Sequence, residues 1–209
     1  MKEQLQLHRE KIGQARAYMR ERGIDLWLIR DRGSGDPSVP LLFGTPTEGD
    51  TIYFVTEGRL VTLVPREEQS LLEDAELFDE VEGYADDGLA AALADRVRAW
   101  DPSSIALNMS RANHLADGLT VGGYRSLLRM LGEPYRSRIV SSEDYVQKLR
   151  SIKSGQEIAY IRRAIEITLE IYDEVFRAVR PGMTEIQVGD LFVEGMRRRG
   201  VVNGITREL

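Results

Sequence analysis

The order of strand-like and helix-like segments predicts an α/β domain with a mixed β-sheet. Short runs of β-branched, aromatic and aliphatic residues alternate with amphipathic segments, which is typical of strands flanked by helices. Two of these runs, residues 51–56 and 59–64, are separated only by Glu57-Gly58 and predict a β-hairpin. The hairpin requires at least one antiparallel pair in the sheet. A hydrophobic content of 42% is enough for a packed core.

The segment before the hairpin predicts a helix, a strand and a long loop. Residues 3–22 suit a helix that ends before Gly23. Residues 25–30 form a short apolar run and predict a buried strand. Residues 32–50 hold four Gly and three Pro, and this density of breakers predicts a loop without regular structure.

The segment after the hairpin predicts further alternation of strands and helices. An acidic region follows first, from Glu67 to Asp87, and predicts a short helix and a strand near residues 77–81. The remaining predicted elements are a helix over 89–100, a buried strand over 104–108, a helix over 123–131 and a short strand over 138–140.

Composition excludes several classes of protein. The net charge of −6 gives no indication of nucleic-acid binding, and the absence of cysteine excludes disulfides, thiolate metal sites and a Cys nucleophile. The N-terminus is too polar for a signal peptide, and no apolar run approaches the ~20 residues of a membrane span. We therefore expect a cytoplasmic protein with no membrane partner.

Charge is distributed unevenly along the chain. Residues 145–209 carry 11 Lys and Arg against 9 Asp and Glu, whereas the preceding residues carry 17 against 25. Such a shift in charge balance predicts a domain boundary, with one domain over 1–144 and a second over 145–209.

Residues 146–200 contain the most specific pattern in the chain. Ser154 with Glu157, and Thr184 with Gln187, each have the spacing of a capping box that starts a helix. Arg180-Pro181-Gly182 predicts the end of the first helix, because Pro cannot donate to the helical ladder and Gly tolerates the following turn. Apolar residues at three- and four-residue steps predict that one face of this helix is buried: Ile158, Ile161, Ile165, Leu169, Tyr172, Phe176 and Val179.

The order LRSIKS, EIAYIRRA, VRPGMTE and a helix closing in MRRRG resembles the entry to the pita-bread catalytic domain. Xaa-Pro aminopeptidases, prolidases and creatinases share this domain. The resemblance is specific over Val146 to Gly200, and residues 1–145 resemble more loosely the N-terminal domain of these enzymes. It implies a creatinase/prolidase-type N-terminal domain over 1–144, with a mixed β-sheet flanked by helices. The first two helices of an incomplete pita-bread domain would follow over 145–209.

The resemblance also implies a chemistry. Such enzymes bind two divalent metal ions, commonly Mn, Co or Zn, and activate a bridging water that attacks the amide before proline. Their metal ligands are two Asp, one His and two Glu that follow these two helices, and the present sequence stops at Leu209. We therefore expect no metal site and no peptidase activity in this chain alone. We expect instead that it caps a substrate cleft for a proline-containing peptide and assembles a homodimer.

Candidate substrate-binding residues follow the first predicted strand. In similar enzymes this loop faces the active site, often that of the other subunit. Arg30, Asp31, Arg32 and Asp36 lie where a charge could contact substrate. The Tyr and Gly-Phe order typical of the family's loop is altered here to residues 42–44, Leu-Phe-Gly. The alternative is that these charged side chains are only solvated on a surface loop and contact no substrate.

Other motifs favour structural roles. Gly33-Ser34-Gly35 could suggest a phosphate site, but Pro37 and Pro40 argue against the helix N-terminus that such a site needs. His8 is expected to be solvated, and His114 with Ser110 and Asp117 is expected to form a loop or cap rather than a catalytic triad.

Three further patterns are expected to carry no site. The acidic residues between Glu73 and Asp87 lack the spacing of a calcium loop and are expected to be solvated. Arg197-Arg198-Arg199 are explained by the dipole of the helix that they end. Asn108-Met109-Ser110 matches a glycosylation sequon without a secretion signal, so we interpret it as coincidence.

Two rival functions remain open. The chain could be a non-catalytic binding or scaffold module that shares this fold, or the front of a creatinase-type amidinohydrolase. Nothing in residues 1–209 separates these hypotheses from the peptidase hypothesis.

Overall fold

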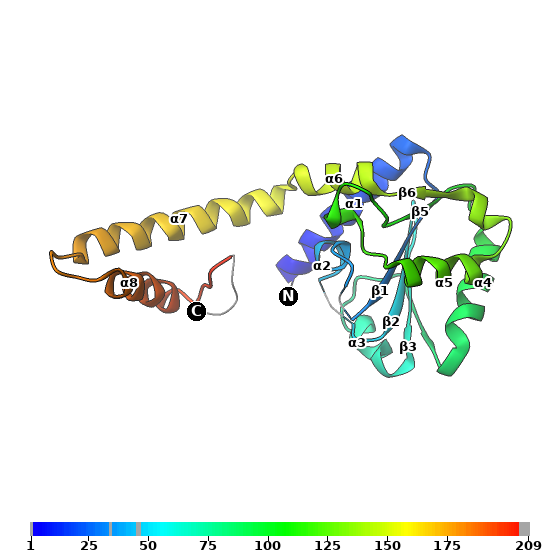
Figure 1. Ribbon diagram of the computed structural model, residues 1–209, viewed down its shortest axis with the longest axis horizontal. Coiled ribbons are helices and arrows are strands. Elements are labelled where there is room, and N and C mark those ends of the chain that lie inside the picture. Colours follow the sequence, from blue (N-terminus) through cyan, green and yellow to red (C-terminus); the bar gives the residue numbers. More distant parts are fainter. Residues whose placement is uncertain (1, 34, 45–46, 205–209) are drawn as a thin grey trace. The chain divides into compact units, whose positions relative to one another are not determined.

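The computed structural model describes residues 2–33, 35–44 and 47–204. It divides into two compact units, Met1–Ser154 and Gly155–Leu209 (Figure 1). The first unit is an α/β domain and the second is a pair of helices. Among the helices described, none is long and apolar enough to cross a membrane.

The first unit is built on one mixed sheet of six strands in the order β4-β3-β2-β1-β5-β6. β2 pairs antiparallel with both β1 and β3, and the other neighbouring strands pair in parallel. The β2–β3 pair is the predicted hairpin. The strands are β1 (Leu26–Arg32), β2 (Asp50–Thr56), β3 (Leu60–Pro65), β4 (Glu80–Tyr84), β5 (Ile105–Leu107) and β6 (Ile139–Ser141).

Helices cover both faces of this sheet (Figure 1). One face packs against α1, α2, α3 and α6, and the other packs against α4 and α5. The helices are α1 (Lys2–Arg22), α2 (Ser38–Leu42), α3 (Gln69–Glu73), α4 (Leu89–Trp100), α5 (Val121–Leu131) and α6 (Glu143–Ser151). The mixed α/β architecture predicted from the sequence is therefore confirmed.

The central strand β1 contributes to a core on each face of the sheet. Trp27 and Ile29 belong to the core under α1 and α6, whereas Leu26 and Leu28 belong to the core under α4 and α5. All four side chains are completely buried. This alternation follows from the two-residue period of a strand and explains why the run is apolar throughout.

The prediction that residues 32–50 contain no regular structure is wrong, because α2 lies within them. Proline is compatible with this helix at both of its positions. Pro37 precedes the first helical residue, and Pro40 lies in the first turn, where a backbone N–H has no acceptor within the helix. The Asp36 carboxylate accepts the free N–H of Ser38 at 2.8 Å and so stabilises the start of the helix.

The helix α6 belongs to the first unit. Tyr145, Val146 and Leu149 are buried in the core that α1 covers, so this unit continues to Ser154 rather than to the residue 144 boundary expected from charge. The predicted strand near 77–81 is also shifted, because β4 begins at Glu80.

The second unit consists of α7 (Gly155–Ala178) and α8 (Glu185–Arg198), which pack against each other. Ile171 and Val175 on α7 are buried, and Gly195 on α8 lies so close to Ile171 that a Cβ would come within 2.9 Å of it. The predicted capping box of Thr184 and Gln187 is present. The capping box at Ser154 and Glu157 stays a prediction.

The prediction that one face of the first of these helices is buried is wrong for this chain. The side of α7 that contacts α8 carries Ile171 and Val175, and of the predicted apolar face Tyr172 also contacts α8, with 4.9 Å between its ring centroid and that of Phe192. Leu169 is 63% exposed and Phe176 is 70% exposed. All seven predicted positions are exposed: Ile158, Ile161, Ile165, Leu169, Tyr172 and Phe176 on α7, and Val179 directly after it. We call these seven residues the α7 apolar stripe.

Candidate functional site

The four predicted substrate-binding residues lie at the carboxyl end of β1 but on opposite faces of the sheet. Arg30 and Arg32 project toward the α5 side, while Asp31 projects toward the side that α2 covers. Asp36 lies next to Asp31, because the Asp36 N–H donates to the Asp31 carboxylate at 2.9 Å. The structure therefore divides the four residues into two pairs rather than one site.

Arg30 is buried and internally neutralised. Its guanidinium binds both oxygens of Asp50 on β2, at 2.7 and 2.5 Å, and also donates to the carbonyl of Gly123 on α5 at 3.2 Å. Two parallel N–H···O bonds fix the planar guanidinium against the carboxylate. Arg30 thus ties β1, β2 and α5 together.

Arg32 is the one member of the four whose side chain is mostly exposed, at 66%. It lies 3.6 Å from the Asp50 carboxylate, which Arg30 already neutralises. Arg32 also lines a cavity of about 260 Å³ between the end of β1 and the start of α5. Of the predicted residues, Arg32 is therefore best placed to contact a molecule outside the domain.

The second pair belongs to a buried polar network centred on Asn108, the residue that follows β5. The Asn108 amide donates to both oxygens of Asp36, each at 2.8 Å, and to the Ser38 hydroxyl at 3.0 Å. Its oxygen accepts the Trp27 indole N–H at 2.8 Å and the Ser142 hydroxyl at 2.6 Å. All five residues are buried, and the network joins β1, α2, β5 and the start of α6.

Burial changes the acid–base properties of this network. Removal from water raises the pKa of Asp36 to about 6, even though hydrogen bonds from Asn108 and Ser38 favour the ionised form. The neighbouring Asp31 charge acts in the same direction as burial on the pKa of Asp36 and is part of this shift. Burial likewise raises the pKa of Tyr145, whose ring lies edge-on to Trp27 with 5.0 Å between centroids.

Gly118 completes the packing around Asp36. A Cβ atom at Gly118 would overlap the Asp36 carboxylate, so only glycine fits at this point without a rearrangement. Gly118 also lines the cavity beside Arg32. The wall of that cavity therefore lies directly over the buried network.

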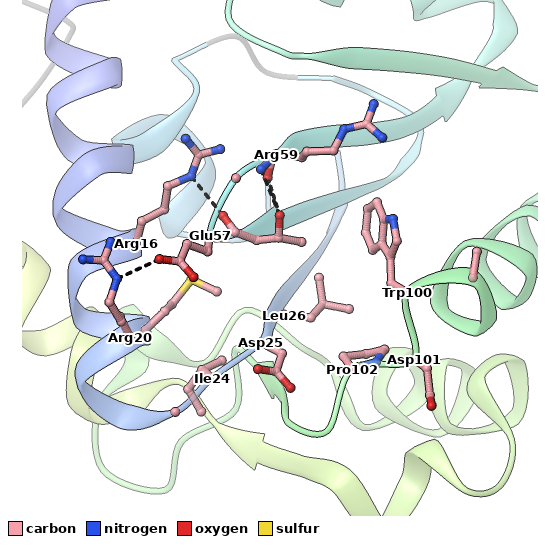
Figure 2. A pocket seen from close by; sticks show the side chains of 15 residues that line it. Arg16, Arg20, Ile24, Asp25, Leu26, Glu57, Arg59, Trp100, Asp101 and Pro102 are labelled. Carbon is pink, nitrogen blue, oxygen red and sulfur yellow. Dashed lines mark hydrogen bonds and ion pairs between the residues drawn. The ribbon is translucent and has the colours of Figure 1, made fainter.

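A larger groove, of about 610 Å³, lies at the amino end of β1 (Figure 2). Its charged side chains bind other side chains or nearby backbone. Arg20 donates to Glu57 at 3.0 Å, and Arg16 donates to the carbonyl of Thr56 at 2.9 Å (Figure 2). The Asp25 carboxylate accepts the Ser103 N–H at 2.7 Å. The first two contacts join α1 to the β2–β3 hairpin, and the third joins the loop after α4 to the residue before β1.

The described residues do not fit a divalent metal centre. In the described ranges, no three His, Cys, Asp or Glu side chains gather as metal ligands would. Asp31 and Asp36 are adjacent, but the Asp36 oxygens face N–H donors of Asn108 and Ser38, where a cation would need free lone pairs.

The histidines have structural surroundings. His8 was expected to be solvated, but its ring lies against Gly44 and burial lowers its pKa. Ser110 and Asp117 bind backbone N–H groups of their own loop rather than His114. The triad reading therefore has no geometric basis.

The other charged motifs are mainly ion-paired. Arg96 on α4 binds Glu80 and Glu82 of β4, so the acidic region is not simply solvated. Of the three consecutive arginines, Arg199 binds Glu174 across the two helices of the second unit. The phosphate interpretation of residues 33–35 also fails for a specific reason, since the Asp36 carboxylate occupies the start of α2; Ser34 lies outside the described residues.

Two buried residues escaped the sequence analysis. Asn108 was interpreted only as part of a sequon, although a polar residue directly after a buried strand is a signal for the edge of a sheet. Lys11 is completely buried and donates to the carbonyls of Leu149, at 2.6 Å, and Ile152, at 3.3 Å, at the end of α6. No sequence pattern indicates that contact, because it joins segments far apart in the chain.

Comparisons with known proteins give matches at the level of structure. No protein-family model and no curated protein sequence matches the chain. The crystal structure of an X-Pro aminopeptidase from Thermotoga maritima matches with a TM-score of 0.63 and 23% identity, over 85% of this chain and 48% of that one. An Xaa-Pro dipeptidase from Bacillus anthracis matches with a TM-score of 0.63 and 19% identity, over 92% and 49%.

An isolated domain also matches. The creatinase/prolidase N-terminal domain of an X-Pro dipeptidase from Streptococcus pyogenes has a TM-score of 0.51 and 20% identity, and the match covers 66% of this chain and 97% of the domain. The chain spans about half of the length of the longer structures that it matches. The chain therefore has the fold of the N-terminal part of Xaa-Pro aminopeptidases and prolidases, including their creatinase/prolidase N-terminal domain.

Proposed function

We propose that this chain is the N-terminal portion of an Xaa-Pro aminopeptidase- or prolidase-like hydrolase, in which it caps the substrate cleft and assembles the dimer. The observation that carries the proposal is the similarity of fold. It extends from an isolated N-terminal domain to matches covering 92% of this chain, and so includes part of the helical pair after Ser154.

The arrangement of charges supports a capping role. Arg30, Asp31 and Asp36 hold the end of β1 rigidly, and Arg32 presents an exposed cation beside a cavity. A guanidinium at the rim of a rigid sheet can bind the carboxylate of a short peptide. The substrate class that we propose for the whole enzyme is a peptide with proline after the scissile bond.

Catalysis would depend on residues outside this chain. Two divalent metal ions, Mn, Co or Zn, would supply the activated water and polarise the amide in the parent enzyme. Since the described residues contain no group of three His, Cys, Asp or Glu side chains that could hold a metal ion, we expect the 209-residue protein to be inactive by itself.

The α7 apolar stripe supports an assembly role. Exposed apolar surface that is continuous along a helix favours association, because contact removes it from water. We expect dimers or higher oligomers. Leu169→Lys combined with Phe176→Lys should shift the protein toward monomer, whereas Thr168→Lys on the same helix should not.

The test combines turnover and sedimentation of the purified 209-residue protein. We expect no hydrolysis of an Xaa-Pro dipeptide with Mn, Co or Zn, and a sedimentation coefficient above that of a monomer. Stoichiometric, metal-dependent turnover would show that the chain carries its own catalytic site. A sharply monomeric boundary would contradict the assembly role.

A further inference from the structure

We propose that Asp36, Asn108 and Ser142 form a proton-sensitive switch that couples the segment after β1 to the start of α6. The proposal concerns the first unit alone and does not depend on the proposed function.

The orientation of the Asn108 amide is determined by its partners. The Trp27 indole can only donate a hydrogen bond, so the amide oxygen must face Trp27, at 2.8 Å. The amide nitrogen then faces Asp36, where both carboxylate oxygens lie at 2.8 Å. Both oxygens of an ionised Asp36 carboxylate can accept hydrogen bonds from this nitrogen. The ionised carboxylate therefore stabilises the observed orientation of the amide.

A proton on Asp36 disturbs this arrangement. One acceptor becomes a donor that faces the N–H groups of Asn108 and Ser38, and the remaining bonds lose their ionic character. If Asn108 turned its oxygen toward the new O–H, its nitrogen would face the Trp27 N–H, which is also a donor. Either outcome weakens a hydrogen bond inside the network.

The change reaches α6 by two routes. The Ser142 hydroxyl, immediately before α6, donates to the same Asn108 oxygen that binds Trp27. Near the other end of α6, Arg150 donates to the carbonyl of Pro37, the residue after Asp36, at 3.3 Å. α6 thus contacts the Asp36-Pro37 segment near both of its ends.

The surroundings place this titration near neutral pH. Asp31 from β1 adds repulsion, Tyr53 from β2 and Tyr145 from α6 are neutral phenols, and Arg150 from α6 is the nearby cation. α2 and β5 bring only neutral partners, Ser38 and the Asn108 that follows β5. Burial and Asp31 together raise the pKa of Asp36 to about 6.

The two tryptophans provide the test. In the 209-residue protein labelled with ¹⁵N, the indole N–H resonance of Trp27 should move between pH 5 and pH 7.5 with a midpoint near 6. Trp100 lies outside the network and should not move in this range. The amide resonance of Val146, which donates to the Ser142 carbonyl, should move over the same range with the same midpoint near 6.

Two variants sharpen the assignment. Asp36→Asn should abolish the Trp27 titration, and Asp31→Asn should lower its midpoint without removing it. A Trp27 resonance that stays constant across this range in the unaltered protein would overturn the proposal, as would an unchanged titration in Asp36→Asn. If Asp36→Asn fails to fold, the titration of the Trp27 resonance in the wild-type protein and its midpoint in Asp31→Asn still test the proposal.

Discussion

The two units of this chain differ in the burial of their large apolar residues. In Met1–Ser154 the apolar residues of β1, β2 and β3 are buried between helices, and even charged residues such as Lys11 and Asp31 are completely enclosed. In Gly155–Leu209 most large apolar residues of α7 are exposed. An apolar pattern shows which face of an element avoids water, whereas burial requires a second element that covers it.

The largest difference is expected for matched leucine truncations. Leu28→Ala should lower the free energy of unfolding by about 2–5 kcal/mol, because it removes a buried side chain from the core under α4 and α5. In dilute, monomeric protein, Leu169→Ala, at a position that is 63% exposed, should change it by less than about 0.5 kcal/mol. Urea denaturation followed by circular dichroism measures both values. Equal effects would mean that the α7 apolar stripe is covered in solution.

Arg30 and Arg32 form a second matched pair within the first unit. Arg30→Ala should cost about 3 kcal/mol of unfolding free energy, because it leaves the Asp50 carboxylate without its bidentate partner. Arg32→Ala should cost less than about 1 kcal/mol, since the side chain is mostly exposed. Thermal unfolding of the two variants in parallel checks the difference. A larger loss for Arg32→Ala would contradict the assignment of Arg30 as the structural residue.

The buried Asp36 gives the first unit a pH dependence near pH 6. Its folded pKa of about 6 lies above the unfolded value of 3.8, so the folded state binds the proton more tightly. The stabilisation is complete below about pH 4 and is lost as the pH rises through 6, by up to about 3 kcal/mol. The difference in unfolding free energy between wild type and Asp36→Asn, measured from pH 4 to 7, isolates this contribution. A difference that does not vary with pH would refute it.

The smallest expected effect concerns the capping box of the second unit. Thr184→Ala removes the hydroxyl that accepts the Gln187 N–H and should destabilise α8 by about 1 kcal/mol. Thr168→Ala is the control, because its hydroxyl only donates to the Ala164 carbonyl one turn earlier. Hydrogen exchange of the α8 amides should increase in the first variant and stay unchanged in the second.

Short sequence patterns predicted the elements that depend only on residues close together in the chain. The β2–β3 hairpin follows from its turn and β-branched residues, and the start of α8 follows from Thr184 and Gln187. The helix α2 was missed because breakers were counted without asking where in a helix Pro37 and Pro40 would lie.

Contacts between distant segments could not be predicted in this way. The candidates Arg30 and Asp31 are adjacent in sequence, yet strand geometry sends them to opposite faces, and Asn108 joins Asp36 across 72 positions of the chain. The burial of α7 was misjudged for the same reason, since periodicity does not report what lies opposite a helix. For the site, the sequence analysis chose residues near the carboxyl end of β1 and missed Asn108, which lies at the centre of the buried network.

The contact of Lys11 with the end of α6 has a consequence for biosynthesis. It joins residues that are 138 positions apart, so α1, which is synthesised before α6, cannot complete this contact until nearly the whole unit has been synthesised. Until α6 emerges, the apolar side of α1 and the sheet beneath it lack one of their covers. A nascent chain arrested before residue 149 should therefore depend on chaperones, and one extended well past residue 154 should not.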